Sequence, residues 1–445
     1  MAEISRPLSA VERWYWFCDQ IAALNVISRV QIRGELGIHA LRDGLNLLQA
    51  RHPLLRAKIE HEKGANPRWV KCDRPIPLRE VQRASDDQWV REVNEHELGE
   101  QVDPGSGPLI RAVAVIGDDN VYDLLLVLPH IICDGTTALS LAEQWLTLST
   151  SSGSPEWEAR ILASAEEMRP TQFIGDEGTR RLVEQTNSDK ELWSRCKPGR
   201  VKPSASVPFA ERRARLIHRE LSADQLEAIA DAARNYGTTV HGALTAALVL
   251  AAARDDDAER SHFAIGSPVN FRGELSPSVR PDEVGTYVAT IPTVVNVTLP
   301  FWDVAREVTT QLTERKNRGD HFNLVNLVMG AVPQSITDFH PFMETMEAEG
   351  PINLVSSNIG RHQFPELIGG LEVSNAQFLA GISVLGYFVA TINTSHGRTF
   401  WNFTHIDKAF PKKRAERIID DCLQILFDAI NGRSTSILQG AEHVQ

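Results

Sequence analysis

The segment that decides the fold is Val121-Tyr-Asp-Leu-Leu-Leu-Val-Leu-Pro-His130-Ile-Ile-Cys-Asp134-Gly135-Thr-Thr-Ala-Leu. An apolar run of strand length ends at Pro129 and His130, and apolar residues at helical spacing follow Asp134-Gly135. A histidine at the exit of a buried strand, with a carboxylate four positions later, suits a general base that its loop holds in place. The segment therefore indicates a reaction type as well as an α/β fold.

The same pattern, His-x-x-x-Asp-Gly, also occurs at His39-Ala-Leu-Arg-Asp43-Gly44. There it lies among apolar residues spaced as one face of a helix, and no strand precedes it. His39 and Asp43 are expected to be neighbours on a helix surface, a solvated pair that contributes about 0.2–0.5 kcal/mol. A pattern that occurs twice is weak evidence by itself, and its context favours His130.

Composition narrows the classes of protein. The chain has 445 residues, 42% apolar and 23% charged, which is typical of globular proteins and long enough for two domains. The net charge of −12, without a dense Lys/Arg block, argues against a nucleic-acid binder. Five cysteines without paired spacing indicate neither a disulfide framework nor a zinc site. Because signal-peptide and transmembrane patterns are missing, we expect a soluble, cytoplasmic protein.

The first half of the chain mixes predicted helices and strands. Residues 38–49 predict a helix, and residues 54–60 predict the strand that follows it. Residues 110–116 and 121–128 predict a hairpin around the turn-forming cluster Gly117-Asp-Asp-Asn. The first half should therefore form a sheet with helices packed on it.

The second half repeats this mixed style. Ser222 and Gln225 form a capping box before an apolar-periodic helix, and a second helix is expected from about Thr239. A final amphipathic helix should begin at Pro411 and stop at Gly432.

The weakly patterned residues between the halves predict the domain organisation. We expect an N-terminal domain over residues 1–175, a connecting segment over 176–215 and a C-terminal domain over 216–445. The fold class is then α/β (α+β).

Several segments, in a fixed order, make the chain similar to one superfamily. Besides the His130 segment they are Arg51-His-Pro-Leu-Leu-Arg56, Gly107-Pro-Leu-Ile-Arg111, Gly266-Ser-Pro-Val-Asn-Phe-Arg272, Val284-Gly-Thr-Tyr-Val-Ala-Thr-Ile-Pro292 and Ser356-Ser-Asn-Ile-Gly360. This set resembles the condensation-type acyltransferases, which include chloramphenicol acetyltransferase, condensation domains of nonribosomal peptide synthetases, plant BAHD enzymes and polyketide-associated acyltransferases. The resemblance covers most of the chain, from about residue 7 to residue 430.

Departures from the family pattern refine the assignment. Condensation domains usually carry two adjacent histidines, and here Pro129 takes the first place, so His130 matches the catalytic one. The Asp-Phe-Gly-Trp-Gly motif of the plant enzymes is missing, which argues against that branch. Because no carrier or adenylation module accompanies the motifs, the chain most resembles a free-standing polyketide-associated or single-condensation enzyme.

The resemblance implies a fold and a role for His130. The expected architecture is two chloramphenicol-acetyltransferase-like domains, each a mixed sheet flanked by helices, with the active-site tunnel between them. His130 would be the general base that deprotonates the acceptor as it attacks a thioester carbonyl. A core histidine satisfied at a strand end is the alternative reading.

The resemblance also implies supporting residues. Asp134 would pair with Arg272 and stay structural, and Gly135 would mark a closely packed helix start. Asn358, with Ser357 as second choice, would contact the oxyanion or the acceptor. An ordinary surface arginine, a plain helix-start glycine and a polar turn remain the respective alternatives.

Two other chemistries at this site have weaker support. Cys133 beside the motif raises the option of a Cys–His nucleophile, but neighbouring positions point in different directions. His130 and Asp134 lack a third ligand at a recognisable spacing, so no metal is predicted.

The predicted activity is acyl transfer from a thioester to a hydroxyl, in natural-product or complex-lipid biosynthesis. An amide-forming condensation enzyme is the alternative within enzymes, and a non-catalytic scaffold that binds carrier proteins is the alternative of another class. No cofactor is expected to stay bound. The donor is acyl-CoA or a phosphopantetheine-linked acyl group on a carrier protein, with CoA slightly favoured, and the acceptor is a small molecule.

Overall fold

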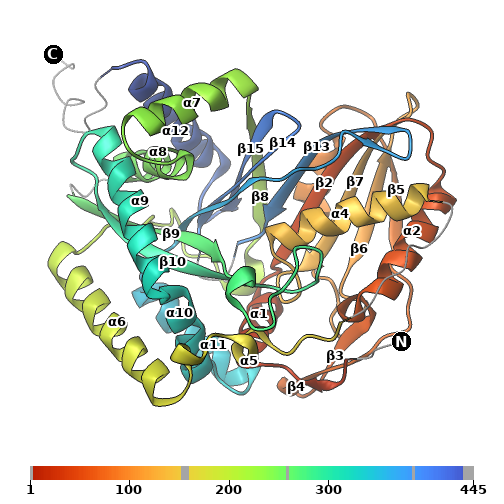
Figure 1. Ribbon diagram of the computed structural model, residues 1–445, viewed down its shortest axis with the longest axis horizontal. Helices are drawn as coiled ribbons and strands as arrows, with labels where there is room; N and C mark the ends of the chain where they lie inside the picture. The colour runs from red at the N-terminus through yellow and green to blue at the C-terminus, as the bar shows by residue number, and fades with distance from the viewer. Residues whose placement is uncertain (1–3, 152–159, 257–259, 383–385, 434–445) are drawn as a thin grey trace.

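The computed structural model describes residues 4–151, 160–256, 260–382 and 386–433. Two six-stranded sheets, one in each lobe, dominate the molecule, and helices flank both of them (Figure 1). Each sheet combines parallel and antiparallel pairs. The predicted two-lobed α/β fold with mixed sheets is confirmed.

The sheet of the first lobe has the strand order β12-β13-β2-β7-β6-β5. Its strands are β2 (Asn25–Arg33), β5 (Leu78–Gln82), β6 (Arg111–Ile116), β7 (Val121–Pro129), β12 (Leu367–Ile368) and β13 (Leu371–Ala380). Strand β7 is antiparallel to both β2 and β6, and all its residues are buried. That burial explains the nearly continuous apolar run in its sequence, and the predicted hairpin of β6 and β7 is confirmed.

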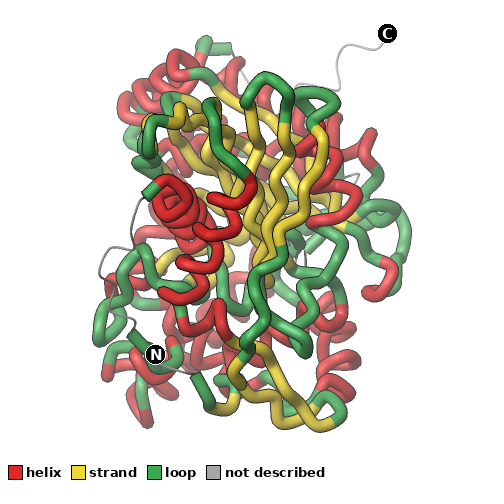
Figure 2. Tube along the Cα trace, turned by 90° about the vertical axis from the view of Figure 1, so that its right-hand side faces the viewer, coloured by secondary structure: helices red, strands yellow, loops and turns green. Residues whose placement is uncertain are grey.

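Helices α2 (Ile38–Arg51) and α4 (Gly135–Thr150) lie against one another on one face of this sheet. Trp145 of α4 donates a hydrogen bond to the Leu41 carbonyl of α2 over 2.9 Å. Figure 2 shows the strands side by side with helices along one face. The helix predicted over residues 38–49 is thus confirmed.

Below this sheet, β1 (Arg6–Pro7), β3 (Ala57–Glu62) and β4 (Ala65–Lys71) form a small three-stranded sheet. Strand β3 starts later than the predicted 54–60, because Pro53–Arg56 forms a 3-10 turn. Proline at the first position fixes a backbone angle that suits such a turn. The apolar residues after it fit a strand equally well, so the sequence does not reveal the turn. The helices α1 (Ala10–Ile21) and α3 (Gln88–Glu92) complete the lobe.

The sheet of the second lobe has the order β10-β9-β11-β14-β15-β8. Its strands are β8 (Ala214–Leu221), β9 (His262–Asn270), β10 (Val288–Asn296), β11 (Leu354–Arg361), β14 (Phe388–Ser395) and β15 (Arg398–Ile406). The lobe's helices are α7 (Ala223–Asn235), α8 (Val240–Arg254), α9 (Phe301–Arg318), α10 (Asp320–Ala331), α11 (Ile336–Glu349) and α12 (Lys412–Ile430). Ser222 caps α7 with the predicted box, and the predicted helices after Thr239 and Pro411 are present.

The two sheets do not each belong to one half of the chain. Strands β12 and β13 follow β11 in sequence but join the first sheet, next to β2. The Asn393 side chain of β14 accepts from Phe378 N over 3.2 Å and donates to Ala376 O over 3.0 Å. The first lobe is therefore completed by residues that the sequence assigns to the range 216–445.

The range 176–215, expected to connect the domains, contains the 22-residue helix α6 (Gly175–Cys196). Among its residues only Gly178 is buried, so few apolar side chains mark this helix in the sequence. Asp189 of α6 accepts both hydrogen bonds of a bidentate ion pair with Arg315 of α9, at 2.8 Å. The short helix α5 (Ala165–Met168) precedes it.

Across the described residues, no single helix has both the length and the apolar composition needed to cross a membrane. Helices α7 and α8 meet that test only as a pair, and they are bent by 97° at their junction.

Candidate active site

His130 lies directly after the last residue of β7, and both lobes hold its backbone. Its N–H donates to the carbonyl of Leu24, before β2, over 2.8 Å. Its carbonyl accepts from the hydroxyl of Thr286, in the segment before β10. The structure therefore places His130 where the two lobes meet, with its side chain partly buried.

Asp134 caps the N-terminus of α4 and forms a buried ion pair. Its Oδ1 accepts from Thr137 N over 3.0 Å, and its Oδ2 accepts from Arg272 Nη1 over 2.7 Å and from Tyr287 N over 3.0 Å. Burial alone raises the pKa of Asp134, but the Arg272 charge and these hydrogen bonds outweigh it and hold the pKa below its ordinary value. Both carboxylate oxygens of Asp134 are therefore engaged by groups of the protein.

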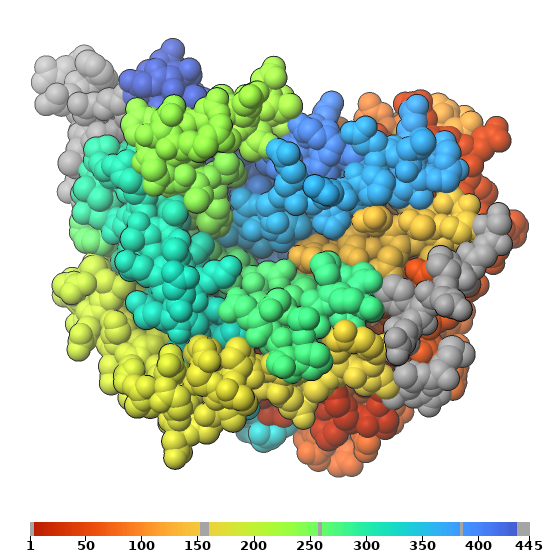
Figure 3. Space-filling view, viewed as in Figure 1, coloured from red at the N-terminus to blue at the C-terminus, as the bar shows by residue number. Residues whose placement is uncertain are grey.

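Arg272 extends this network between the lobes. Its second nitrogen donates to the hydroxyl of Thr137, which itself donates to the carbonyl of Gly285 over 2.8 Å. The guanidinium also lies over the ring of Tyr287, 4.9 Å from the centroid. Figure 3 shows the green segment before β10 packed across the junction against the gold helix α4. The ion pair and its neighbours thus fasten the His130 loop to the second lobe.

Gly135, the first residue of α4, faces the ring of Phe378 in β13. A Cβ at this position would lie 2.7 Å from the ring, closer than real contacts allow. The glycine therefore lets the helix start approach the strand that crosses from the second half of the chain. Sequence reasoning left a plain helix-start glycine as an alternative, and this contact supplies a packing reason instead.

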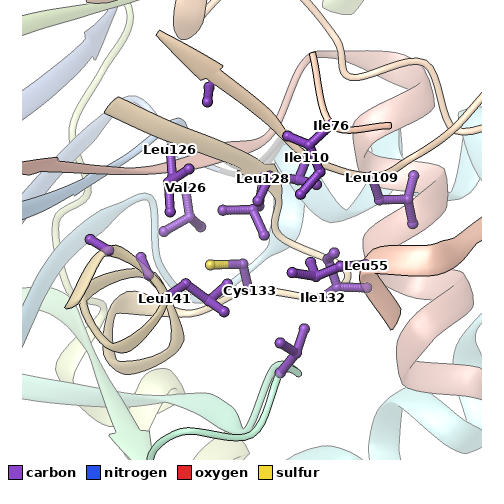
Figure 4. Packing of buried hydrophobic residues seen from close by; sticks show 14 of the residues in the cluster. Val26, Leu55, Ile76, Leu109, Ile110, Leu126, Leu128, Ile132, Cys133 and Leu141 are labelled. Carbon is purple, nitrogen blue, oxygen red and sulfur yellow. The ribbon is translucent and has the colours of Figure 1, made fainter. Parts of the chain in front are cut away.

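The side chain of Cys133 points into the apolar core of the first lobe. Figure 4 shows its sulfur among Leu128 of β7, Leu141 of α4 and Val26 of β2. Burial raises the pKa of the Cys133 thiol well above its ordinary value. A thiol kept protonated in such a core packs as a small apolar residue, so it is a poor nucleophile.

Among the described residues, no carboxylate is hydrogen-bonded to the imidazole of His130. Its Nδ1 is buried and makes no hydrogen bond within the described residues, which leaves Nε2 as the nitrogen available to a substrate. Burial, opposed by nearby backbone carbonyls and by the Asp134 charge, lowers the pKa of His130. The ring is therefore neutral near pH 7, the form that can accept a proton.

Tyr15 of α1 stacks on the His130 ring, with centroids 4.7 Å apart and ring planes inclined by 23°. Sequence reasoning missed this residue, as it missed Thr137, Thr286 and Tyr287. An aromatic run, Trp14-Tyr-Trp-Phe17, marks α1 in the sequence, but nothing in it shows which ring meets the histidine. The structure alone supplies that pairing.

Asn358 and Ser357 lie on β11, both partly buried. The Asn358 carbonyl oxygen accepts from Gly360 N over 2.8 Å, in a local turn-like contact. Within the described residues neither side chain has a hydrogen bond to the His130 loop. The structure thus brings together His130, Asp134, Gly135 and Arg272, and does not bring Asn358 or Ser357 into direct contact with them.

A small cavity of about 70 Å³ adjoins the His130 loop. Tyr15 and Ile131 line it from the first lobe, and Gly285, Thr286 and Tyr287 line it from the second. Free space therefore exists at the lobe junction next to Ile131, the residue after His130, although His130 itself does not line it.

Comparisons with known proteins agree with this geometry. Residues 210–394 match the family model described as phthiocerol/phthiodiolone dimycocerosyl transferase C-terminus. A probable non-canonical nonribosomal peptide synthetase of Salinispora arenicola is 25% identical over 302 residues, which is 64% of this chain and 4% of that protein. The chain spans only 1–4% of the length of the first curated relatives that it matches.

Solved structures share the fold over nearly the whole chain. Trichothecene 15-O-acetyltransferase from Fusarium sporotrichioides superposes with a TM-score of 0.74 at 14% identity, covering 95% of both chains. The epimerization domain from the third module of tyrocidine synthetase B superposes with a TM-score of 0.70 at 14% identity, covering 97% of both chains. The C-terminal part of the chain is thus similar to an acyltransferase family, and the whole chain has the fold of condensation-type enzymes, in agreement with the resemblance that its motifs carry.

Proposed function

We propose that this protein is an acyltransferase that moves an acyl group from a thioester to a hydroxyl, with His130 as general base. The observation that carries the proposal is the partly buried imidazole at the lobe junction, presented by a loop that the Asp134–Arg272 pair fastens to the second lobe. Similarity to a dimycocerosyl transferase and to an O-acetyltransferase supports an oxygen acceptor. A role in natural-product or complex-lipid biosynthesis is part of the proposal.

The reaction assigns a task to each group. His130 Nε2 takes the hydroxyl proton as the acceptor oxygen forms its bond to the thioester carbonyl carbon. The tetrahedral intermediate then collapses, the carbon–sulfur bond breaks, and the thiolate takes the proton from the imidazolium. The products are an ester and a free thiol, and the histidine is neutral again.

Substrate entry requires a channel through the lobe junction. A thioester on CoA or on a carrier protein presents a long, thin phosphopantetheine arm, so the proposal includes a tunnel to His130 with donor and acceptor entering from opposite faces. The cavity lined by Tyr15, Ile131 and Thr286 supports only free space near the His130 loop, and a continuous channel to the imidazole is part of the proposal.

An amide-forming condensation enzyme is the second candidate, because nonribosomal peptide synthetases are among the matching relatives. The purified protein should be incubated with acyl-CoA or acyl-carrier protein, each with an alcohol or an amine acceptor. Mass spectrometry then identifies the products. We expect ester formation that depends on His130. Amide products alone would replace the first candidate by the second, and binding of carrier protein without turnover of any thioester would favour a scaffold.

A further inference from the structure

A general base needs its ring held in one orientation, and among the described residues no carboxylate holds the ring of His130. In many hydrolases a carboxylate fixes the base histidine by hydrogen bonding to its second nitrogen. Here Asp134 spends both oxygens on Thr137, Tyr287 and Arg272, and His130 Nδ1 has no hydrogen-bond partner in the described chain. The orientation of the imidazole therefore depends on packing, together with the backbone carbonyls of His130 and Cys133 that lie near the ring.

The group packed on the imidazole is the phenol ring of Tyr15. The centroid distance of 4.7 Å and the inclination of 23° describe a stacked pair. A flat ring face in contact restricts the imidazole to orientations parallel to it. It also favours the imidazolium that forms when the base takes a proton, because the π face of an aromatic ring attracts a cation.

The same helix also supports the backbone of His130. Asp19, one turn after Tyr15, accepts from Leu24 N over 2.9 Å, and Leu24 O accepts from His130 N over 2.8 Å. Helix α1 thus fixes both the ring and the main chain of the histidine, through two residues on one face.

Helix α1 is itself firmly held. Glu166 of α5 accepts from Val11 N over 2.7 Å, and Phe17 packs on Phe339 of α11 with centroids 5.0 Å apart. Ser9 caps the helix with Glu12 in a capping box. A ring carried by an anchored helix serves as a fixed wall.

We propose that Tyr15 is a positioning residue for the base. Its ring holds the His130 ring in place by stacking, and its hydroxyl takes no part. The inference rests on the proposed function and adds a residue to it. Burial raises the pKa of the Tyr15 phenol above its ordinary value, so the hydroxyl is neutral wherever the enzyme is assayed. The stacking role requires the ring and does not require that oxygen.

Two variants of Tyr15 separate the ring from the hydroxyl. Tyr15→Phe keeps the flat face and should keep kcat within about threefold of the parent. Tyr15→Leu keeps bulk but loses the flat face, and should lower kcat roughly 10- to 100-fold with little change in KM, as expected when a catalytic group is misplaced. Tyr236→Leu is the matched control, because Tyr236 stacks on Trp302 in the second lobe at 4.6 Å, and it should leave kcat unchanged.

Nuclear magnetic resonance of ¹³C-labelled histidines tests the contact without any substrate. His130→Ala assigns the His130 ring signal, which should carry a ring-current shift in the parent and in Tyr15→Phe and lose it in Tyr15→Leu. A signal that does not change in Tyr15→Leu would overturn the proposal, even if the chain turned over no thioester. Parent-like kcat in a folded Tyr15→Leu variant, or equal losses in both variants, would overturn it as well.

Discussion

The two His-x-x-x-Asp-Gly segments share a pattern and differ in everything that surrounds it. His39 and Asp43 are exposed on α2, in the first two turns of a continuous helix. His130 follows a fully buried strand, and Asp134 is the buried N-cap of the next helix. A loop between two buried elements can present one side chain at a defined place, whereas a helix surface presents its side chains to water. The comparison teaches that the elements beside a motif decide whether it can form a site.

The largest expected difference between the two segments is in catalysis. His130→Ala should leave the fold intact and lower turnover by roughly 10²–10⁴-fold, because it removes the proposed base. His39→Ala should be nearly silent. Steady-state kinetics with a thioester donor, with circular dichroism to verify folding, makes the measurement. Equal losses in the two variants would show that the wrong segment has been chosen.

The second difference concerns the aspartates. Removing one partner of the buried Asp134–Arg272 pair should cost about 3–5 kcal/mol of unfolding free energy, because an unpaired charge stays buried. Asp43→Asn should cost no more than about 0.5 kcal/mol, as for an exposed helix pair. Urea denaturation of Asp134→Asn, Arg272→Met and the double variant tests this. The double variant should cost less than the sum, and simple additivity would speak against coupling.

A third difference concerns pH and the helix that supports His130. Asp19 is 2% exposed, and burial raises its pKa to about 7. A raised carboxyl pKa contributes stability that is complete below the unfolded value of about 3.9 and is lost as pH rises through 7. The parent should therefore lose unfolding free energy between pH 5 and pH 8 that Asp19→Asn keeps. The difference between the two proteins should shift in favour of Asp19→Asn by on the order of 2 kcal/mol. Urea denaturation at both pH values measures it, with Asp43→Asn as control. A pH-independent difference would contradict the expectation.

The smallest difference concerns the glycines, which are alike in structure. A Cβ on Gly44 would lie 2.1 Å from Ser149 Oγ and 3.0 Å from its backbone, and one on Gly135 would lie 2.7 Å from the Phe378 ring. Both alanine variants should lose about 1 kcal/mol or more of stability, because overpacking exceeds the helix preference of alanine. Gly135→Ala should also lower activity, and Gly44→Ala should not. Thermal melts and kinetics on the same samples compare them, and a stabilised Gly44→Ala would refute the packing argument.

Sequence patterns predicted the elements whose periodicity is local. Strand β7, helix α4, the β6–β7 hairpin and the capped helix after Ser222 each follow from residues within one short window. Helix α6 did not follow, because its residues are mostly polar and only Gly178 is buried. The turn at Pro53–Arg56 was merged with the strand after it for a different reason, because its apolar residues fit either element.

At the candidate site, the chain alone singled out His130, through the buried strand before it and the capped helix after it. It also nominated Asp134 and Arg272, the latter by resemblance, and the structure pairs them at 2.7 Å. Asn358 was nominated in the same way; its oxygen accepts from Gly360 N, and its contact with the oxyanion or the acceptor stays a prediction.

Only the tertiary structure decided that Tyr15 stacks on His130, that Thr286 holds its carbonyl and that β13 closes the first sheet against Gly135. These contacts join residues far apart in the chain, and each depends on how whole elements pack. Periodicity and capping act over a few residues, so they determine what each element is, whereas burial of apolar faces determines which elements meet. The sequence by itself thus determined the family resemblance, the strand–loop–helix unit and its histidine, and the packing of the two lobes determined the surroundings of that histidine.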